Sequence, residues 1–274
     1  MAQSHASLIR SIYDERSSTY DDSFHGILAD DYIRVAEPKE GEYVLDLACG
    51  TGLVALQASQ RVGNSGYVVG IDISDGMLEV GRRKAERQGL NVPFIQHDIS
   101  DMTGLKLLPD GSQGFDLITC AAALVLLPDP QKAIKHWSTL LKPGGRLITD
   151  VAAKDVNVPS RLFTQIGRQL GKTLLWDQSW VQSEESLAKL LRDSELRVET
   201  VFLTRCYQTR EYTTQKAPEA FEQAVASPMY RNFGEPSVRE EAKRLFVGAF
   251  KQEAEAGGVL LDEAKMYMAV AYKI

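Results

Sequence analysis

Two glycines in the stretch VLDLACGTG (residues 44–52) stand where a backbone can pass close to a bound molecule. Gly50 and Gly52 follow a short apolar run, and because neither has a Cβ, a ligand can approach the free N–H groups that open the next helix. With Ala55 they form GxGxxA, and Asp72 follows at the spacing of a dinucleotide fingerprint. The spacing alone equally fits a tight turn that binds nothing.

Three acidic residues follow three successive apolar runs and narrow the choice of ligand. Asp46 precedes the glycines within the same run, where its charge would repel a pyrophosphate and suit a cationic group. Asp72, in GIDIS, is placed to accept hydrogen bonds from a ribose diol, and Asp98, in QHDIS, to accept one from the adenine amine. Each acid alone fits a solvated loop or a helix cap, but together they predict a ligand with an ammonium, a diol and an adenine.

The chain after Tyr43 alternates between short apolar runs and helical patterns, which is typical of βα units on a parallel sheet. In such a sheet, ligands bind at the carboxyl ends of the strands, so the three acids converge there. Ser74 is expected to cap a helix that Gly89 ends, and LKPGG to form a turn before the fifth strand. The predicted strands are 43–47, 67–72, 93–97, 115–120 and 145–151, and the predicted helices are 52–62, 75–88 and 129–141.

Beyond Val151 the pattern changes. We expect a helix over 183–195 that opens with a capping box at Ser183, one long strand over 197–212, helices over 217–256 and a final strand over 264–273. The chain is accordingly divided into an N-terminal helical lid (1–40), a sheet core (41–214 and 259–274) and a helical cap inserted at 215–258. The segment 156–180 is expected to help the cap cover the carboxyl edge of the sheet.

Composition restricts the class of protein. The chain has 274 residues, 44% hydrophobic and 25% charged, and no apolar segment is long enough to span a membrane. Its first residues lack the apolar region of a secretory signal, and Cys49, Cys120 and Cys206 show no paired spacing. We therefore expect a soluble, cytoplasmic protein with reduced thiols. A net charge of -6 offers no cationic surface for nucleic acid.

Five motifs in order resemble those of class I S-adenosylmethionine-dependent methyltransferases: VLDLACGTG, GIDISDGML, FIQHDISD, FDLITCAAALVLLPDP and LLKPGGRL. The resemblance covers roughly residues 40–150, and the core is similar to small-molecule enzymes of the ubiquinone-biosynthesis type. It implies an α/β fold with a Rossmann-like seven-stranded sheet and helices on both faces. The N-terminal helices and a helical cap between the last two strands would complete that fold.

The resemblance also implies which residues hold S-adenosylmethionine, whose product is S-adenosylhomocysteine. The acid of the first motif and its glycines would meet the methionine end, the acid after the second strand the ribose, and the acid after the third strand the adenine. Tyr20 would reach the cofactor from the N-terminal helices, although helix packing is the more common role for such a residue. The implied cofactor residues are Tyr20, Asp46, Ala48, Gly50, Gly52, Asp72, Ile73, Met77, Asp98, Ile99, Cys120 and Ala121.

The chain departs from the family pattern after the fourth strand. TCAAA stands in place of the Asn/Asp-Pro-Pro-aromatic motif of enzymes that methylate planar amines, and Val125 and Leu126 stand where many small-molecule relatives have two histidines. No cluster of metal ligands is visible. We therefore expect catalysis mainly by proximity and alignment. His25 is the first candidate for a general base, with helix packing as its alternative role.

Aromatic residues outside the core are expected to line an acceptor pocket or to pack within the cap: Tyr13, Phe163, Trp176, Trp180, Tyr207, Tyr230 and Phe233. Without a basic patch, such a pocket favours a neutral, largely apolar organic molecule.

The sequence leaves several alternatives open. We expect O-methylation in natural-product biosynthesis, ahead of N-methylation and of C-methylation of the ubiquinone or sterol type. The insertion after Tyr212 looks like that of fungal tailoring enzymes. A nicotinamide oxidoreductase and a noncatalytic binding subunit are the alternatives from other classes, and the protein is either a monomer or a homodimer.

Overall fold

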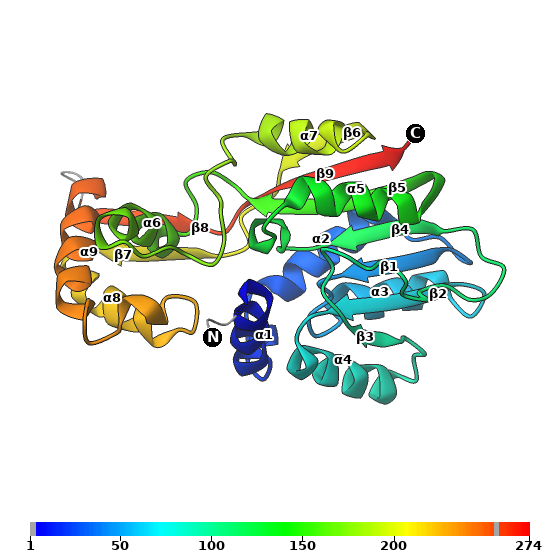
Figure 1. The fold of residues 1–274 in the computed structure, drawn as a ribbon, viewed down its shortest axis with the longest axis horizontal. Coiled ribbons are helices and arrows are strands. Elements are labelled where there is room, and N and C mark those ends of the chain that lie inside the picture. Colours follow the sequence, from blue (N-terminus) through cyan, green and yellow to red (C-terminus); the bar gives the residue numbers. More distant parts are fainter. Residues whose placement is uncertain (1–3, 255–257) are drawn as a thin grey trace.

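A computed structural model describes residues 4–254 and 258–274. Its main sheet has seven strands in the order β3-β2-β1-β4-β5-β9-β6 (Figure 1). β1 to β5 run parallel, whereas β9 is antiparallel to both of its neighbours. The strands are β1 Tyr43–Leu47, β2 Tyr67–Asp72, β3 Phe94–Gln96, β4 Phe115–Cys120, β5 Leu141–Ala152, β6 Leu196–Leu203 and β9 Met266–Lys273. The predicted α/β, Rossmann-like fold is confirmed.

Helices cover both faces of this sheet because successive side chains of each strand point to opposite sides. Leu45 and Ile71 enter one apolar core, while Val44 and Val68 enter the other. The first core is closed by α5 (Pro130–Leu140) and α7 (Glu184–Asp193), and the second by α2 (His25–Ala36), α3 (Leu53–Val62) and α4 (Asp75–Gln88). The parallel strands are therefore buried on both sides, as their continuous apolar runs predict.

A separate helical unit lies beyond one end of the sheet (Figure 1). We call this unit the cap from here on; it is larger than the predicted insertion at 215–258. It consists of α6 (Val158–Leu170), α8 (Ala217–Ala226) and α9 (Arg239–Glu253), which share an apolar core of their own, and of a two-stranded sheet formed by β7 (Thr209–Thr213) and β8 (Val259–Glu263). Short 3-10 helices occur at Tyr20–Asp22, Leu124–Leu126, Thr214–Lys216 and Arg231–Phe233.

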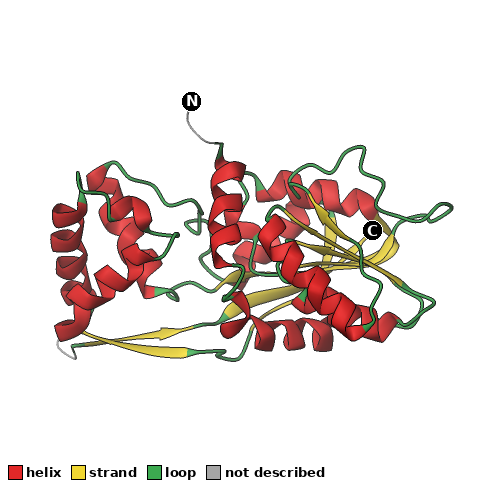
Figure 2. Ribbon diagram, turned by 90° about the horizontal axis from the view of Figure 1, so that it is seen from below, coloured by secondary structure: helices red, strands yellow, loops and turns green. Residues whose placement is uncertain are grey.

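The N-terminal helix α1 (His5–Arg16) lies between the cap and the sheet (Figure 2). The carboxylate of Asp14 accepts hydrogen bonds from Ser74 Oγ and Gly76 N at the start of α4. On the other side, Arg231 of the cap forms an ion pair of 2.7 Å with Glu15. α1 is thus attached to both parts of the molecule. Among the described residues, no helix combines the length and the apolar composition needed to cross a membrane.

The structure corrects three expectations about the elements. The predicted long strand 197–212 is divided into β6 and β7, because the pairing with the returning segment becomes irregular around Arg205 and Cys206; β8 was not predicted. The stretch 217–256 is interrupted by Pro228 and Pro236, which lack an N–H for helical bonding, and its residues 255–256 lie outside the described part. LKPGG belongs to β5, where the pairing with β4 shifts in register.

The predicted caps are confirmed. The side chain of Ser74 accepts a hydrogen bond from Met77 N at the start of α4, and Gly89 ends that helix with φ +66°. Ser183 and Ser186 form the capping box that opens α7. These local signals were readable because each depends on residues only a few positions apart.

Candidate active site

The loop after β1 is held in a left-handed conformation and tied to the loop after β2. Ala48, Gly50 and Gly52 have φ values of +50°, +54° and +79°. One carboxylate oxygen of Asp72 accepts from Gly50 N and the other from Ser74 N, both at 2.8 Å. Asp72 thereby fixes the two loops against each other at the carboxyl edge of the sheet, and burial raises its pKa to about 6.

Beside this loop lies a cavity of about 290 Å³, which we call the glycine-loop cavity. Its wall includes eight of the predicted cofactor residues: Tyr20, Ala48, Gly50, Asp72, Ile73, Asp98, Ile99 and Ala121. α1 forms the opposite wall through His5, Ile9 and Tyr13, and His5 Nε2 lies 2.8 Å from the carbonyl oxygen of Leu126. The N-terminal helix therefore encloses the cavity against the strand ends.

Four predicted cofactor residues lie outside the wall of this cavity. Asp46 is buried behind the loop and accepts hydrogen bonds from Thr119 Oγ1 and Ala55 N, so it stiffens the loop from within. Burial raises its pKa to about 7. Cys120 offers its carbonyl oxygen to Tyr32 and Thr149. Gly52 and Met77 are also buried in the interior.

Gly52 has a packing role that its sequence motif does not reveal. A Cβ at Gly52 would lie 2.8 Å from Cζ of Phe94, and Cβ atoms at Gly70 and Gly81 would lie 3.0 to 3.1 Å from the same ring. The ring of Phe94 thus occupies a slot made by three glycines from α3, β2 and α4. Gly52 allows both the left-handed turn and this close packing.

We expect Gly52→Ala to lower the free energy of unfolding by about 1–3 kcal/mol more than Gly89→Ala does, because overpacking adds to the backbone strain. Gly89 is the matched control, since it has φ +66° and a Cβ there would meet nothing within 4 Å. Urea unfolding followed by circular dichroism measures both. If both variants lost the same free energy of unfolding, the ring of Phe94 would have to move aside without a measurable loss of stability.

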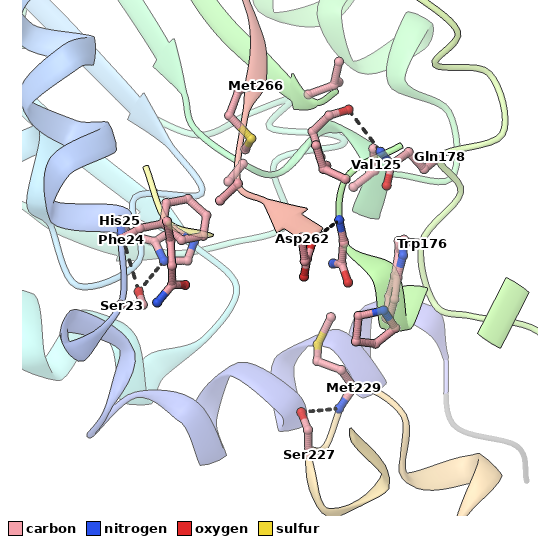
Figure 3. A pocket seen from close by; sticks show the side chains of 18 of the residues that line it. Ser23, Phe24, His25, Val125, Trp176, Gln178, Ser227, Met229, Asp262 and Met266 are labelled. Atoms are coloured by element: carbon pink, nitrogen blue, oxygen red, sulfur yellow. Dashed lines mark hydrogen bonds between the residues drawn. The ribbon is translucent and has the colours of Figure 1, made fainter. Parts of the chain in front are cut away.

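A second cavity, of about 450 Å³, lies between the sheet and the cap, and we call it the cap cavity. Figure 3 shows Ser23, Phe24 and His25 on one side of it and Trp176 on the other, with Met229 on a third side. The two cavities adjoin, because four residues line both: Tyr13, Ala122, Ala123 and Leu126.

Three of the seven predicted pocket aromatics, Tyr13, Trp176 and Tyr230, line the cap cavity. The other four lie elsewhere. Phe163 and Phe233 are buried in the apolar core of the cap, where their rings contact each other in a tilted arrangement with centroids 4.6 Å apart. Trp180 packs against the sheet core, and Tyr207 donates its hydroxyl hydrogen to Asp31. An aromatic side chain suits a protein core as well as a cavity wall, which is why sequence alone did not separate these roles.

His25 lies in a stack of rings at the edge of the cap cavity. Its ring centroid is 4.4 Å from that of Tyr20 and 4.5 Å from that of Phe24, and its Nδ1 lies 2.5 Å from Ser23 Oγ. Burial lowers the pKa of His25 to about 4, so the imidazole is neutral at pH 7. It is close enough to the acceptor region to contact a substrate, but a neutral ring with this pKa is a weak base.

A family model described as a methyltransferase domain matches residues 38–219. The chain belongs to the methyltransferase family. This membership favours methyl transfer over the oxidoreductase and the noncatalytic binding subunit that the sequence left open. Asp72, Asp98 and Gly50, which line the glycine-loop cavity, are among the residues that the sequence predicts to hold S-adenosylmethionine.

Three relatives of the chain are bacterial proteins that are named as methyltransferases. A ubiquinone biosynthesis O-methyltransferase of Coxiella burnetii is 33% identical over 60% of this chain and 64% of its own length. Aklanonic acid methyltransferase DauC of Streptomyces sp. is 34% identical over 49% and 60%, and a ubiquinone/menaquinone biosynthesis C-methyltransferase of Idiomarina loihiensis is 40% identical over 43% and 46%. The matches thus span less than two thirds of these relatives.

Solved structures share the fold of the methyltransferase. A Bacillus halodurans protein, solved as a methyltransferase candidate, superimposes with a TM-score of 0.59 at 19% identity over 89% of this chain and 98% of its own. A geranyl diphosphate methyltransferase in complex with S-adenosylmethionine gives 0.53 at 18% identity over 91% and 85%. At these identities the likeness supports the architecture alone.

Sequence reasoning missed one acidic residue of the methyltransferase site, Asp150. It lies near the end of β5, where it is fully buried and contributes to the wall of the cap cavity. Its Oδ1 accepts a hydrogen bond of 2.6 Å from the N–H of Ala122, one of the residues shared by both cavities. The sequence RLITDV did contain a signal for Asp150. Like Asp72 and Asp98, it is an acid at the carboxyl end of a parallel strand, which is where ligands bind in such a sheet. Within residues 4–254 and 258–274, no group of three or more metal-ligating side chains occurs.

Proposed function

We propose that the methyltransferase transfers the methyl group of S-adenosylmethionine to a hydroxyl oxygen on a small, largely apolar organic molecule. The observation that supports this proposal most strongly is the junction between the two cavities. A cofactor in the glycine-loop cavity and an acceptor in the cap cavity would meet at the four residues common to both walls. Such an arrangement brings two reactants together and excludes water, which is most of what this reaction requires.

We assign the walls of the glycine-loop cavity to parts of the cofactor. Asp72 would accept hydrogen bonds from the ribose hydroxyls and Asp98 one from the adenine amine, with Ile73 and Ile99 beside the base. Tyr20 and the glycine loop would hold the methionine end. When bound, the cofactor supplies a methyl carbon that is already strongly electrophilic. The chain then holds the two reactants, orients them and keeps water away.

The cap cavity favours an apolar acceptor with a few polar groups. Phe24, Trp176 and Met229 give it apolar walls, while Asn157 and Asp262 supply polar contacts at one side. Its volume of about 450 Å³ falls within the range of pockets for small organic molecules. We also propose that the chain is divided into an N-terminal lid (1–40), a sheet core (41–214 and 259–274) and an inserted segment (215–258) that helps to hold the acceptor.

The relatives named above guide the choice of acceptor atom. The Coxiella relative is an O-methyltransferase by name, which supports oxygen, whereas the Idiomarina relative supports carbon as the alternative. The Streptomyces relative supports a place in natural-product biosynthesis. The resemblance of the insertion to that of fungal enzymes stays a prediction. N-methylation stays an alternative, and the protein is either a monomer or a homodimer. A cytoplasmic location belongs to the same proposal, because the three cysteines are free thiols.

Incubation with S-adenosylmethionine labelled in its methyl group, and with a panel of phenolic, hydroxamic and amine metabolites, tests the acceptor atom. We expect label on oxygen, identified by mass spectrometry and by the chemical shift of the new methyl group. Heat-denatured enzyme controls for uncatalysed transfer. Transfer to nitrogen or carbon alone would contradict O-methylation while leaving the methyltransferase assignment intact.

A further inference from the structure

Asp150 is a carboxylate that the proposed cofactor contacts leave unused. Its Oδ1 is occupied by the N–H of Ala122, but its Oδ2 is the one buried side-chain oxygen or nitrogen of the described residues that has no hydrogen-bond partner. A buried acceptor without a partner is costly, so proteins retain such groups where a ligand or a reaction needs them.

Asp150 lies beside the place where the two cavities meet, but its carboxylate is fully buried and must turn toward the cap cavity to touch an acceptor. The residue contributes to the wall of the cap cavity, and its bond to Ala122 attaches it to the strip where this cavity meets the glycine-loop cavity. Ala122 has φ +53°, so the strip is held in an uncommon backbone conformation by this hydrogen bond. The acceptor oxygen must lie near this strip if it is to reach the methyl carbon.

The surroundings of Asp150 favour a carboxylate that gains and loses a proton near neutral pH. Burial raises its pKa to about 7, and the N–H of Ala122, followed by the hydroxyl of Tyr32, partly opposes the shift. Burial raises the pKa of four nearby groups, and the carboxylate of Asp150 adds to each shift: Tyr20, Tyr32, Cys120 and Tyr207. Other titratable or charged residues of the same cavity are Tyr13, Arg16, His25, Arg210, Tyr212, Tyr230, Asp262 and Lys265.

We propose that Asp150 is the general base that accepts the hydroxyl proton of the acceptor during methyl transfer. This inference rests on the proposed O-methylation. As the acceptor oxygen forms its bond to the methyl carbon, the bond from that carbon to the cofactor sulfur breaks, and the electron pair stays on sulfur. The proton of the hydroxyl passes to the carboxylate of Asp150 and leaves to water after the product departs.

His25 is the competing base. Its Nδ1 is engaged with Ser23, and its ring stacks on Phe24 and makes a tilted contact with Tyr20. Its pKa of about 4 makes it a poor proton acceptor. The two candidates predict different pH profiles. If Asp150 is the base, kcat falls as the pH drops through about 7, because the protonated carboxyl cannot accept a proton; if His25 is the base, the fall comes near pH 4.

The experiment compares wild-type enzyme with Asp150→Asn, using the best oxygen acceptor of the panel and a series of ring-substituted phenols of different acidity. The amide oxygen of asparagine still accepts from Ala122 N, but the side chain no longer takes a proton. We expect kcat to fall about a hundredfold, the affinity for S-adenosylhomocysteine to stay within about twofold, and the loss to shrink as the phenol becomes more acidic. The decline of kcat below pH 7 should disappear.

Asp262→Asn is the matched control, because Asp262 also lines the cap cavity and accepts a hydrogen bond from a backbone N–H, that of Asn157. This variant should keep the decline of kcat near pH 7, whatever its rate. Unchanged activity of Asp150→Asn, a loss that is equal for all phenols, or a wild-type decline near pH 4 would each overturn the role of Asp150. Because the pKa values of Asp46 and Asp72 are also raised, to about 7 and about 6, a wild-type decline near pH 7 supports Asp150 only if the decline disappears in Asp150→Asn. A wild-type decline near pH 4 overturns the role of Asp150 even if the variant fails to fold. Methylation of nitrogen or carbon alone would instead refute the proposed function, and the base with it.

Discussion

Asp72→Ala is expected to weaken the binding of S-adenosylhomocysteine by about ten- to a hundredfold, or about 1.5–3 kcal/mol, through the loss of charge-assisted hydrogen bonds. The carboxylate stands at the wall of the glycine-loop cavity and accepts from Gly50 N and Ser74 N. Its removal takes away the proposed ribose contact and also leaves two buried N–H groups without a partner. Isothermal titration calorimetry with S-adenosylhomocysteine measures the effect.

Asp75→Ala serves as the control for this variant. Asp75 begins α4 three residues later in the chain, but its side chain is exposed and pairs with Arg82 away from the cavity. Its removal should leave the affinity for S-adenosylhomocysteine unchanged. Equal affinity for wild-type and Asp72→Ala protein, with both folded by circular dichroism, would refute the assignment of Asp72 to the cofactor.

The free energy of unfolding of the unliganded protein is expected to fall by several kcal/mol between about pH 4 and pH 8. Burial raises the pKa of Asp46 and Asp150 to about 7 and that of Asp72 to about 6. In the unfolded chain all three return to about 3.9. Between these values the folded state binds more protons than the unfolded state, so stability is greatest below the unfolded pKa and declines as the pH rises through the folded pKa.

Urea unfolding at pH 5 and at pH 8 measures this decline, provided the transitions remain two-state. Acids with lowered pKa values, such as Glu37 and Glu241, act in the opposite direction, but they are exposed and solvent screens them. Asp150→Asn should reduce the decline, because it removes one of the three buried carboxyls. A protein that is equally stable at both pH values, or more stable at pH 8, would show that the pKa values of these three carboxyls are not raised in the folded state.

The sheet, and eight of the residues that line the glycine-loop cavity, were predictable from the sequence. Short, nearly continuous apolar runs such as VLDL and FDLITC are typical of parallel strands that are covered on both faces, and polar residues just after such strands gather at one edge of the sheet. Asp72 and Asp98 were found in this way. Gly52 was found for an incomplete reason, since its contact with Phe94 depends on residues of two other elements.

The acceptor side was much less predictable, because its walls come from segments that are distant in sequence. Nothing local distinguishes Trp176, which lines the cap cavity, from Trp180, which packs against the sheet core. The β7 and β8 strands pair only with each other, so their short segments carried little pattern of their own. Asp150 was overlooked although it follows the same positional rule as the other acids.

The attachment of α1 to both α4 and the cap has a consequence for the order of events in turnover. α1 closes one wall of the glycine-loop cavity, so a molecule that enters or leaves on this side must displace the helix. Displacement breaks the bonds from Asp14 to α4 and the ion pair between Glu15 and Arg231. Tyr13 of α1 lines both cavities, so we expect a displacement of α1 to open the proposed cofactor site and the proposed acceptor site together.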